Sequence, residues 1–205
     1  MSIIINEKLM KWFYICLLLF EIMVKFIKNK FYRNGEIILK RKNLVLLCLS
    51  AVAVIFFMCS IFLFSSQDNV QTNTLSKKFT EKIAATVFSG YSAMSEDMKT
   101  AVVSEMNLFI RKTAHFSLYF FMSMVIYLFF AVLRRKYLFS GIISILICFM
   151  YASLDEFHQK FVPGRTPLVK DVMIDTSGAI LGSILCFMII ASVIFISGRR
   201  KKNQL

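Results

Sequence analysis

Ionisable side chains gather in one short stretch of an otherwise strongly apolar chain. The sequence DEFHQKFVPGR, residues 155–165, lies between two apolar runs, and Asp171 and Asp175 follow it closely. It holds carboxylates, a histidine, an amide and an arginine. Ionisable residues at the edge of a membrane are costly to place, so they usually have partners and mark a functional site. The stretch therefore predicts a polar site to which other segments contribute.

Two further segments carry polar groups. The sequence IRKTAHFSLYF, residues 110–120, opens another apolar run, and in it Arg111, His115 and Tyr119 are spaced four residues apart. This spacing stacks them on one face of a helix. Ser-Ser-Gln at residues 65–67 ends the first apolar run. Its serines have no base beside them in the sequence, so a serine nucleophile is not favoured.

General acid–base chemistry is one function that these residue types suggest. Histidine titrates near neutral pH, so His115 and His158 could form a proton-transfer pair, with a carboxylate orienting either ring. Two alternatives stay open: a carboxylate holds His115 purely for packing, or the two histidines and a carboxylate bind a metal ion. The spacing carries no local zinc signature, so we predict no metal and no other cofactor. The candidate catalytic residues are His115, Asp155, Glu156 and His158.

Anion binding is the second function that they suggest. Arg111 and Arg165 suit bidentate binding of phosphate or carboxylate, unless they neutralise the carboxylates in a closed network. We expect Arg111 or His115 to contact a carboxylate directly, because an unpaired charge would be costly. The carboxylates expected in that contact are Asp155, Glu156 and Asp171. The candidate ligand-binding residues are Arg111, Lys112, Tyr119, Gln159, Arg165, Asp171, Asp175 and Gln67.

Membrane helices must position these groups. The 205 residues are 58% hydrophobic and 18% charged, outside the range of soluble domains. Apolar runs at residues 44–64, 116–133 and 178–197 and a shorter uncharged run at residues 138–154 predict four spans. Within the last span, the pair Gly178/Gly182 favours close approach of a neighbouring helix. The predicted fold class is all-α, a polytopic membrane helical bundle.

The net charge of +13 is distributed unevenly over these predicted spans. One side of the membrane receives sixteen Lys/Arg and three Asp/Glu, and the other side receives nine of each. By the positive-inside rule, the basic side is cytoplasmic. We therefore predict a multi-pass protein of the cell membrane with both termini in the cytoplasm. The basic clusters then serve topology and contact with the lipid bilayer, and not nucleic acid.

The chain divides into three parts. Residues 1–43 form a basic N-terminal cytoplasmic or interfacial segment, residues 44–197 form the membrane domain, and residues 198–205 form a basic cytoplasmic tail. Two interpretations of residues 9–28 are open: a helix lying in the inner interface, or a fifth span.

Short amphipathic helices are expected on the outer face, between the first two spans. An apolar residue recurs every fourth position over residues 75–87, and Gly90 breaks this pattern. Ser95 then resembles an N-cap, followed by Glu96 and Asp97 in a first turn.

The polar segments resemble the VanZ-like family of bacterial membrane proteins. The matching stretches are FSSQ at 64–67, IRKTAHFSLYF at 110–120, DEFHQKFVPGR at 155–165 and DVMIDTSGAILG at 171–182. The family pattern usually has Asn where this chain has Asp175, which adds a negative charge. The named family member is associated with low-level teicoplanin resistance in Gram-positive bacteria. The resemblance therefore implies a phenotype, and not a reaction.

Two classes of function follow. In the first, the outer site binds a cell-envelope component, such as a lipid-linked cell-wall precursor, or the lipoglycopeptide itself, and so contributes to teicoplanin resistance. In the second, the site is that of a membrane-embedded hydrolase or transferase acting on a phosphate-bearing envelope substrate by His/Asp acid–base chemistry. A proton-coupled transporter is disfavoured, because the predicted spans lack interior charges.

The charge asymmetry generates a test of orientation. In a background without the five native cysteines, a cysteine at Asp97 should react with an impermeant thiol reagent in intact cells, because the polar side faces outward. A cysteine at Lys201 should react only after the membrane is permeabilised. The reverse labelling pattern would place the polar site inside the cell and contradict the predicted topology.

Overall fold

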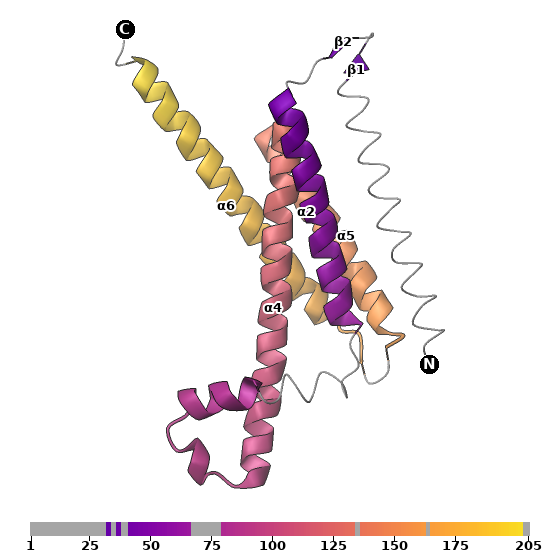
Figure 1. Ribbon diagram of the computed structural model, residues 1–205, viewed down its shortest axis with the longest axis vertical. Coiled ribbons are helices and arrows are strands. Elements are labelled where there is room, and N and C mark those ends of the chain that lie inside the picture. The colour runs from indigo at the N-terminus through magenta and orange to yellow at the C-terminus, as the bar shows by residue number, and fades with distance from the viewer. Residues whose placement is uncertain are drawn as a thin grey trace.

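The computed structural model describes residues 32–33, 36–37, 41–66, 79–133, 136–162 and 165–202. Within these residues the fold is all-helical apart from one two-residue antiparallel pair (Figure 1). The strands are β1 (Tyr32–Arg33) and β2 (Glu36–Ile37), and the helices are α2 (Arg41–Ser65), a helix at 79–87, the 3-10 turn η1 (Tyr91–Ala93), α4 (Glu96–Val132), α5 (Tyr137–Gln159) and α6 (Val169–Lys202).

The four predicted spans are confirmed. Each of α2, α4, α5 and α6 is long and apolar enough to cross a membrane. The β1–β2 pair precedes α2 and was not predicted. The alternatives for residues 9–28, and the turn expected at Pro163 and Gly164, lie outside the described residues.

Helix α4 is longer than a membrane span needs. It has 37 residues, and Ser95 caps its first turn by accepting a hydrogen bond from the Met98 backbone N–H at 3.4 Å. No glycine or proline interrupts it, so the helix that begins at this cap runs into the membrane without a break. The second predicted amphipathic helix is therefore the first part of α4 and not a separate element.

The helix at 79–87 turns its apolar stripe away from the protein. Phe79 and Val87 are 61% and 64% exposed, whereas Thr80 and Ala84 are fully buried. Gly90, with φ of 92°, ends this part of the chain in the left-handed region that glycine adopts most readily. The exposed stripe is what a helix lying on a bilayer surface requires.

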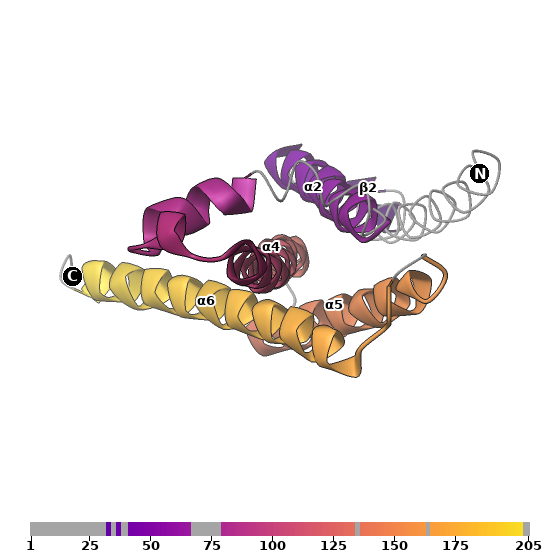
Figure 2. The same ribbon diagram turned by 90° about the horizontal axis from the view of Figure 1, so that it is seen from below.

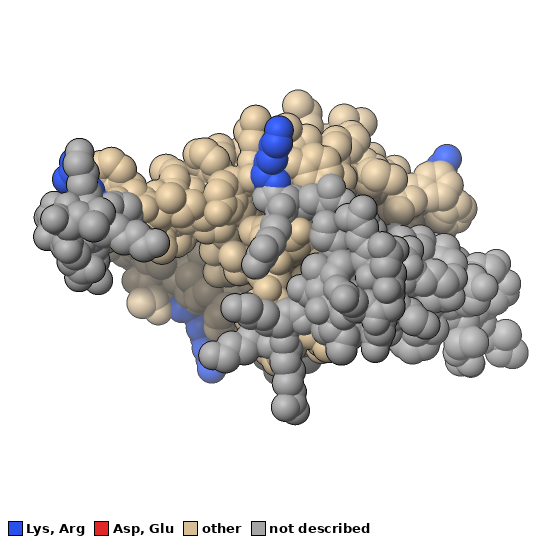
Figure 3. Space-filling view, turned by 90° about the horizontal axis from the view of Figure 1, so that it is seen from above, with Lys and Arg blue, Asp and Glu red and all other residues tan. Residues whose placement is uncertain are grey.

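Helix α4 is the central element of the bundle. It contacts α2, α5 and α6, and Figure 2 shows α2 on one side of it and α5 with α6 on the other. We call the end at which α2 and α5 end and α6 begins the polar end, and the opposite end the basic end. Figure 3 looks at the basic end, where the charged side chains that can be seen among the described residues are Lys and Arg.

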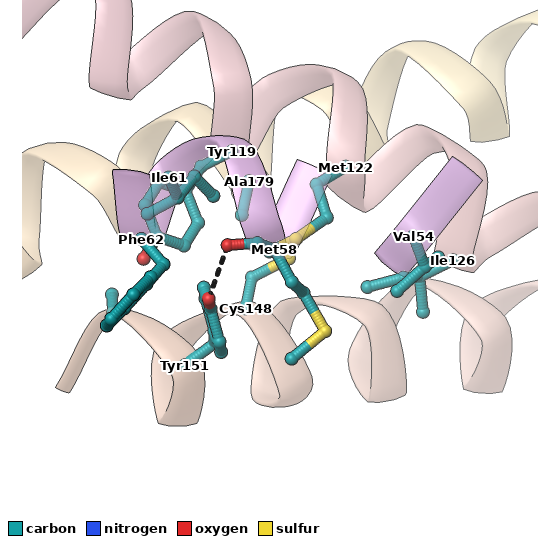
Figure 4. Packing of buried hydrophobic residues seen from close by; sticks show 11 residues of the cluster. Val54, Met58, Ile61, Phe62, Tyr119, Met122, Ile126, Cys148, Tyr151 and Ala179 are labelled. Carbon is teal, nitrogen blue, oxygen red and sulfur yellow. Dashed lines mark hydrogen bonds between the residues drawn. The ribbon is translucent and has the colours of Figure 1, made fainter. Parts of the chain in front are cut away.

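An apolar core lies directly beneath the polar end (Figure 4). Tyr119 from α4 and Tyr151 from α5 have ring centroids 6.3 Å apart, and the Tyr151 hydroxyl donates a 2.6 Å hydrogen bond to the Met58 carbonyl of α2. A buried polar group without a partner would be costly, so this bond fixes α5 against α2. Deeper in the bundle, Ser144 and Ser183 share a 2.8 Å hydrogen bond between α5 and α6.

Two glycines set the register of α6 on α4. A Cβ atom at Gly178 would overlap the Phe116 carbonyl oxygen, and one at Gly182 would overlap the Phe120 carbonyl oxygen and the Ser123 hydroxyl. The two helices run in the same direction, and the two contacting residues are separated by the same number of sequence positions in both contacts. The close approach predicted from the Gly178/Gly182 pair is confirmed, and its partner is α4.

Substitution of Gly182 by alanine should therefore destabilise the protein. The added methyl group must push α6 away from the α4 backbone, an overpacking cost of about 1–3 kcal/mol. Thermal unfolding in detergent measures the effect as a lowered Tm. The control is Gly141→Ala, because a Cβ there meets its nearest atom, Tyr127 Cε2, at 3.4 Å, an ordinary contact. An unchanged Tm for Gly182→Ala would show that α6 does not lie this close to α4.

Candidate functional site

The polar end brings together all three polar segments predicted from the sequence. Ser65 and Ser66 end α2, residues 111–119 lie on α4, residues 155–159 close α5, and residues 171–175 form the start of α6. The convergence follows from the bundle, because α2 and α5 end where α6 begins and α4 passes between them (Figure 1). Gln67, a further candidate, lies outside the described residues.

A hydrogen-bonded chain joins α2 to α5. The Ser65 hydroxyl donates to Asp155 Oδ2 at 2.6 Å, and the Gln159 amide donates to the same oxygen at 3.1 Å. Arg165 then donates through Nη1 to Gln159 Oε1 at 3.4 Å and through Nη2 to the Phe64 carbonyl at 3.2 Å. Ser65, Asp155 and Gln159 are all buried, so the chain secures the end of α2 from within.

His158 lies beside a serine that has no base near it in the sequence. Its Nε2 is 3.4 Å from Ser66 Oγ, and its ring lies 4.9 Å from that of Phe62. This neighbour does not make Ser66 a nucleophile, because the serine hydroxyl donates a 2.7 Å bond to the Phe62 carbonyl. The Ser66 hydroxyl is therefore engaged in capping α2.

Two charge pairs join α4 to α6. Lys112 Nζ is 2.6 Å from Asp171 Oδ1, and His115 Nδ1 is 3.8 Å from Asp175 Oδ2. Arg111 or His115 was expected to contact Asp155, Glu156 or Asp171 directly. That prediction was wrong, because the carboxylate that His115 contacts is Asp175. His115 takes Asp175, which lies one turn further along α6 than Asp171. Asp175 contributes the carboxylate of this pair.

Between these groups lies a small pocket that opens at the polar end. Its enclosed cavity is about 20 Å³, room for about one water molecule, and the remainder of the pocket is open to the exterior. Apart from Ile174, every lining residue had been predicted as a site residue. The lining residues are Arg111, Lys112, His115, Glu156, Gln159, Asp171, Ile174 and Asp175.

Arg111 and Glu156 differ from the paired charges of this pocket. Within the described residues, Arg111 has no carboxylate at ion-pair distance and no hydrogen-bond partner. Glu156 accepts one hydrogen bond, from the Leu168 backbone N–H at 2.9 Å. The guanidinium and this carboxylate thus face one pocket without being joined.

Three buried polar atoms near the pocket have no hydrogen-bond partner among the described residues: His115 Nε2, Tyr119 Oη and Asp155 Oδ1. Tyr119 lies one helical turn below His115, and Tyr151 lies one turn below Asp155, so the polar layer rests on a layer of tyrosines. Buried polar atoms rarely lack partners, and a bound water or a ligand group supplies them.

The described residues include no group of three or more His, Cys, Asp or Glu side chains that could hold a metal ion. The alternative metal site of His115, His158 and a carboxylate is therefore not assembled. Each histidine has its own neighbour, Asp175 for His115 and Ser66 for His158.

The Ser65–Asp155 hydrogen bond generates a stability prediction. Ser65→Ala should lower the free energy of unfolding by about 1–3 kcal/mol, because it removes a donor from a buried carboxylate. Ser60→Ala is the matched control on α2, since the Ser60 hydroxyl bonds only within its own helix, to the Phe56 carbonyl at 2.8 Å. Equal losses for the two variants in chemical unfolding would show that the α2–α5 bond carries no special stability.

Comparison with known proteins identifies the family. The family model described as VanZ/LLP1 matches residues 50–191, which contain the ends of all four spans at the polar site. Neither a curated protein nor a solved structure matches the chain. The match covers more than half of the chain and includes every residue of the described site. The chain is therefore a multi-pass membrane protein that belongs to the VanZ/LLP1 family.

Proposed function

We propose that the pocket at the polar end binds a phosphate-bearing component of the cell envelope, such as a lipid-linked cell-wall precursor, and so contributes to resistance to teicoplanin. The polar end faces outward in this proposal, because the charge asymmetry assigns the basic end to the cytoplasm. The pocket then opens at the outer leaflet, where such precursors are exposed.

The observation that carries the proposal is Arg111. It lines the pocket, and no carboxylate pairs with it among the residues that the structure describes. A guanidinium binds phosphate through two parallel hydrogen bonds. A charge-assisted bond contributes roughly 1.5–3 kcal/mol, which corresponds to about a tenfold to hundredfold change in affinity.

Arg165 has a different part in the proposal. Arg111 and Arg165 were both predicted to bind an anion, but Arg165 Nη1 and Nη2 donate to Gln159 and Phe64. We therefore give anion binding to Arg111 and give Arg165 the role of holding Gln159 at the pocket wall. In this proposal ligand binding needs both arginines: Arg111 contacts the anion, and Arg165 maintains the shape of the pocket.

A second candidate is an enzyme of the hydrolase or transferase class, and the His115–Asp175 pair favours it. With Asp175 beside Nδ1, the neutral tautomer that donates toward Asp175 leaves Nε2 as an acceptor. Nε2 has no hydrogen-bond partner among the described residues, and His115 lines the pocket. This arrangement suits a general base that takes a proton from a water molecule or a substrate hydroxyl.

Expression in a susceptible Gram-positive host should raise the inhibitory concentration of teicoplanin. Arg111→Gln and Arg165→Ala should each remove the increase at equal protein level, because they remove the anion contact and its support. Lys99→Gln is the control: Lys99 pairs with Glu96 near the start of α4, outside the pocket lining, and its loss should leave the increase intact.

An unchanged inhibitory concentration with verified membrane expression would count against the resistance role. His115→Gln then separates the two candidates. Retained lipid binding with loss of turnover supports the enzyme, whereas loss of both supports a binding protein that His115 holds together. Mass spectrometry of co-purified lipids measures the binding.

A further inference from the structure

The pocket contains a positive and a negative group that its own side chains leave unjoined. Lys112 is paired with Asp171, and His115 faces Asp175. Arg111 from α4 and Glu156 from α5 both line the pocket, and Glu156 is near enough to attract the guanidinium, but no ion pair or hydrogen bond joins them within the described residues. Glu156 is only 6% exposed, and Arg111 is partly buried.

Keeping the Arg111 and Glu156 charges apart costs free energy unless a bound group forms hydrogen bonds to both. A charge withdrawn from water requires a partner or hydrogen bonds. Glu156 Oε2 has one donor, the Leu168 N–H, and no donor among the described residues bonds to Oε1. His115 Nε2, on a side chain that is 8% exposed, also lacks a partner there beside the same pocket.

The total charge of the pocket argues against a purely anionic occupant. Its lining carries two permanent cations, Arg111 and Lys112, and the three carboxylates Glu156, Asp171 and Asp175. With His115 neutral the lining is net negative, and with His115 protonated its charges balance, so in neither state does the lining have an excess of positive charge. A phosphate that approached Arg111 alone would therefore be repelled by the carboxylates, unless the same ligand carried a positive group toward them.

From this arrangement we propose that the pocket binds a zwitterionic head group, with its phosphate on Arg111 and a primary ammonium on Glu156. The inference rests on the proposed function, since it names the chemical class of the envelope component. A primary ammonium carries three N–H donors. It can therefore bond to Glu156 Oε1 and reach Asp171, whereas a quaternary ammonium has no N–H donor.

The size of the pocket limits what enters it. Its enclosed part is a cavity of about 20 Å³, which has room for one group the size of a water molecule or an ammonium, and the rest of the pocket is open to the exterior. The ammonium of a head group can therefore enter the cavity, while its phosphate stays on the open side. The same chemistry can come from a membrane lipid or from a free phosphoester, and the measurement must separate these two sources.

Native mass spectrometry of the full chain in detergent provides the test. The probes are phosphatidylethanolamine, phosphatidylglycerol and phosphatidylcholine with identical acyl chains, and soluble phosphoethanolamine. The wild type should bind phosphatidylethanolamine at least about tenfold more tightly than the other two lipids, the effect of one favourable hydrogen-bonded contact. Glu156→Gln should remove this preference, because the amide can still accept from Leu168 but no longer carries charge.

Arg111→Gln should lower the affinity for each of the three lipids by about tenfold or more. Lys99→Gln should leave all three affinities unchanged. Binding of soluble phosphoethanolamine that competes with the lipid would show that the head group suffices. Binding of the lipid alone would show that the acyl chains also contribute, with the head-group preference unchanged. If a variant does not fold, as judged by Tm, the comparison of the three lipids on the wild type still decides.

Phosphatidylglycerol bound as tightly as phosphatidylethanolamine would overturn the head-group inference, as would a preference that survives Glu156→Gln. In either case an Arg111-dependent increase in teicoplanin resistance would leave the proposed function standing. If none of the probes binds to the wild type, the head-group inference fails. If Arg111→Gln also leaves teicoplanin resistance unchanged, the proposed function fails with it.

Discussion

Close contact between α4 and α6 is the constraint on which the site depends. Gly178 and Gly182 lie against the Phe116 and Phe120 carbonyls, and Cys186 Sγ continues the same offset with a 3.8 Å contact to the Met124 carbonyl. Backbone-to-backbone packing of this kind allows little sliding or rotation. One register therefore sets the pairs Lys112–Asp171 and His115–Asp175 at the membrane edge. The glycines contribute no chemistry, and yet they decide which charges meet.

The two sides of the polar end are built differently. Between α2 and α5, a hydroxyl and an amide both donate to the Oδ2 atom of the buried Asp155 side chain. Between α4 and α6, the Lys112–Asp171 salt bridge and the His115–Asp175 pair border a pocket instead of filling it. The first side ties α2 to α5 through buried hydrogen bonds, whereas the second ties α4 to α6 and leaves a pocket open beside the pairs.

The spans and the residues of the site could be predicted from the sequence, because long apolar runs indicate spans and charges isolated among them mark polar sites. The pairing of the charges could not. Asp171 and Asp175 lie one turn apart on one helix face, so periodicity alone cannot decide which of them meets His115. That choice depends on how α6 is set against α4, and packing decides it. The length of α4 was also missed, because the change from polar to apolar residues resembles a boundary although no residue breaks the helix.

The 37 residues of α4 correspond to a rod about 55 Å long, against a hydrocarbon layer of roughly 30 Å. The rod carries His115 and Arg111 along its length and has no glycine or proline at which it could bend. The first turns of α4, which begin at Glu96, and the turns that carry Arg111 and His115 are therefore parts of one continuous helix, and their relative positions are fixed by that helix alone.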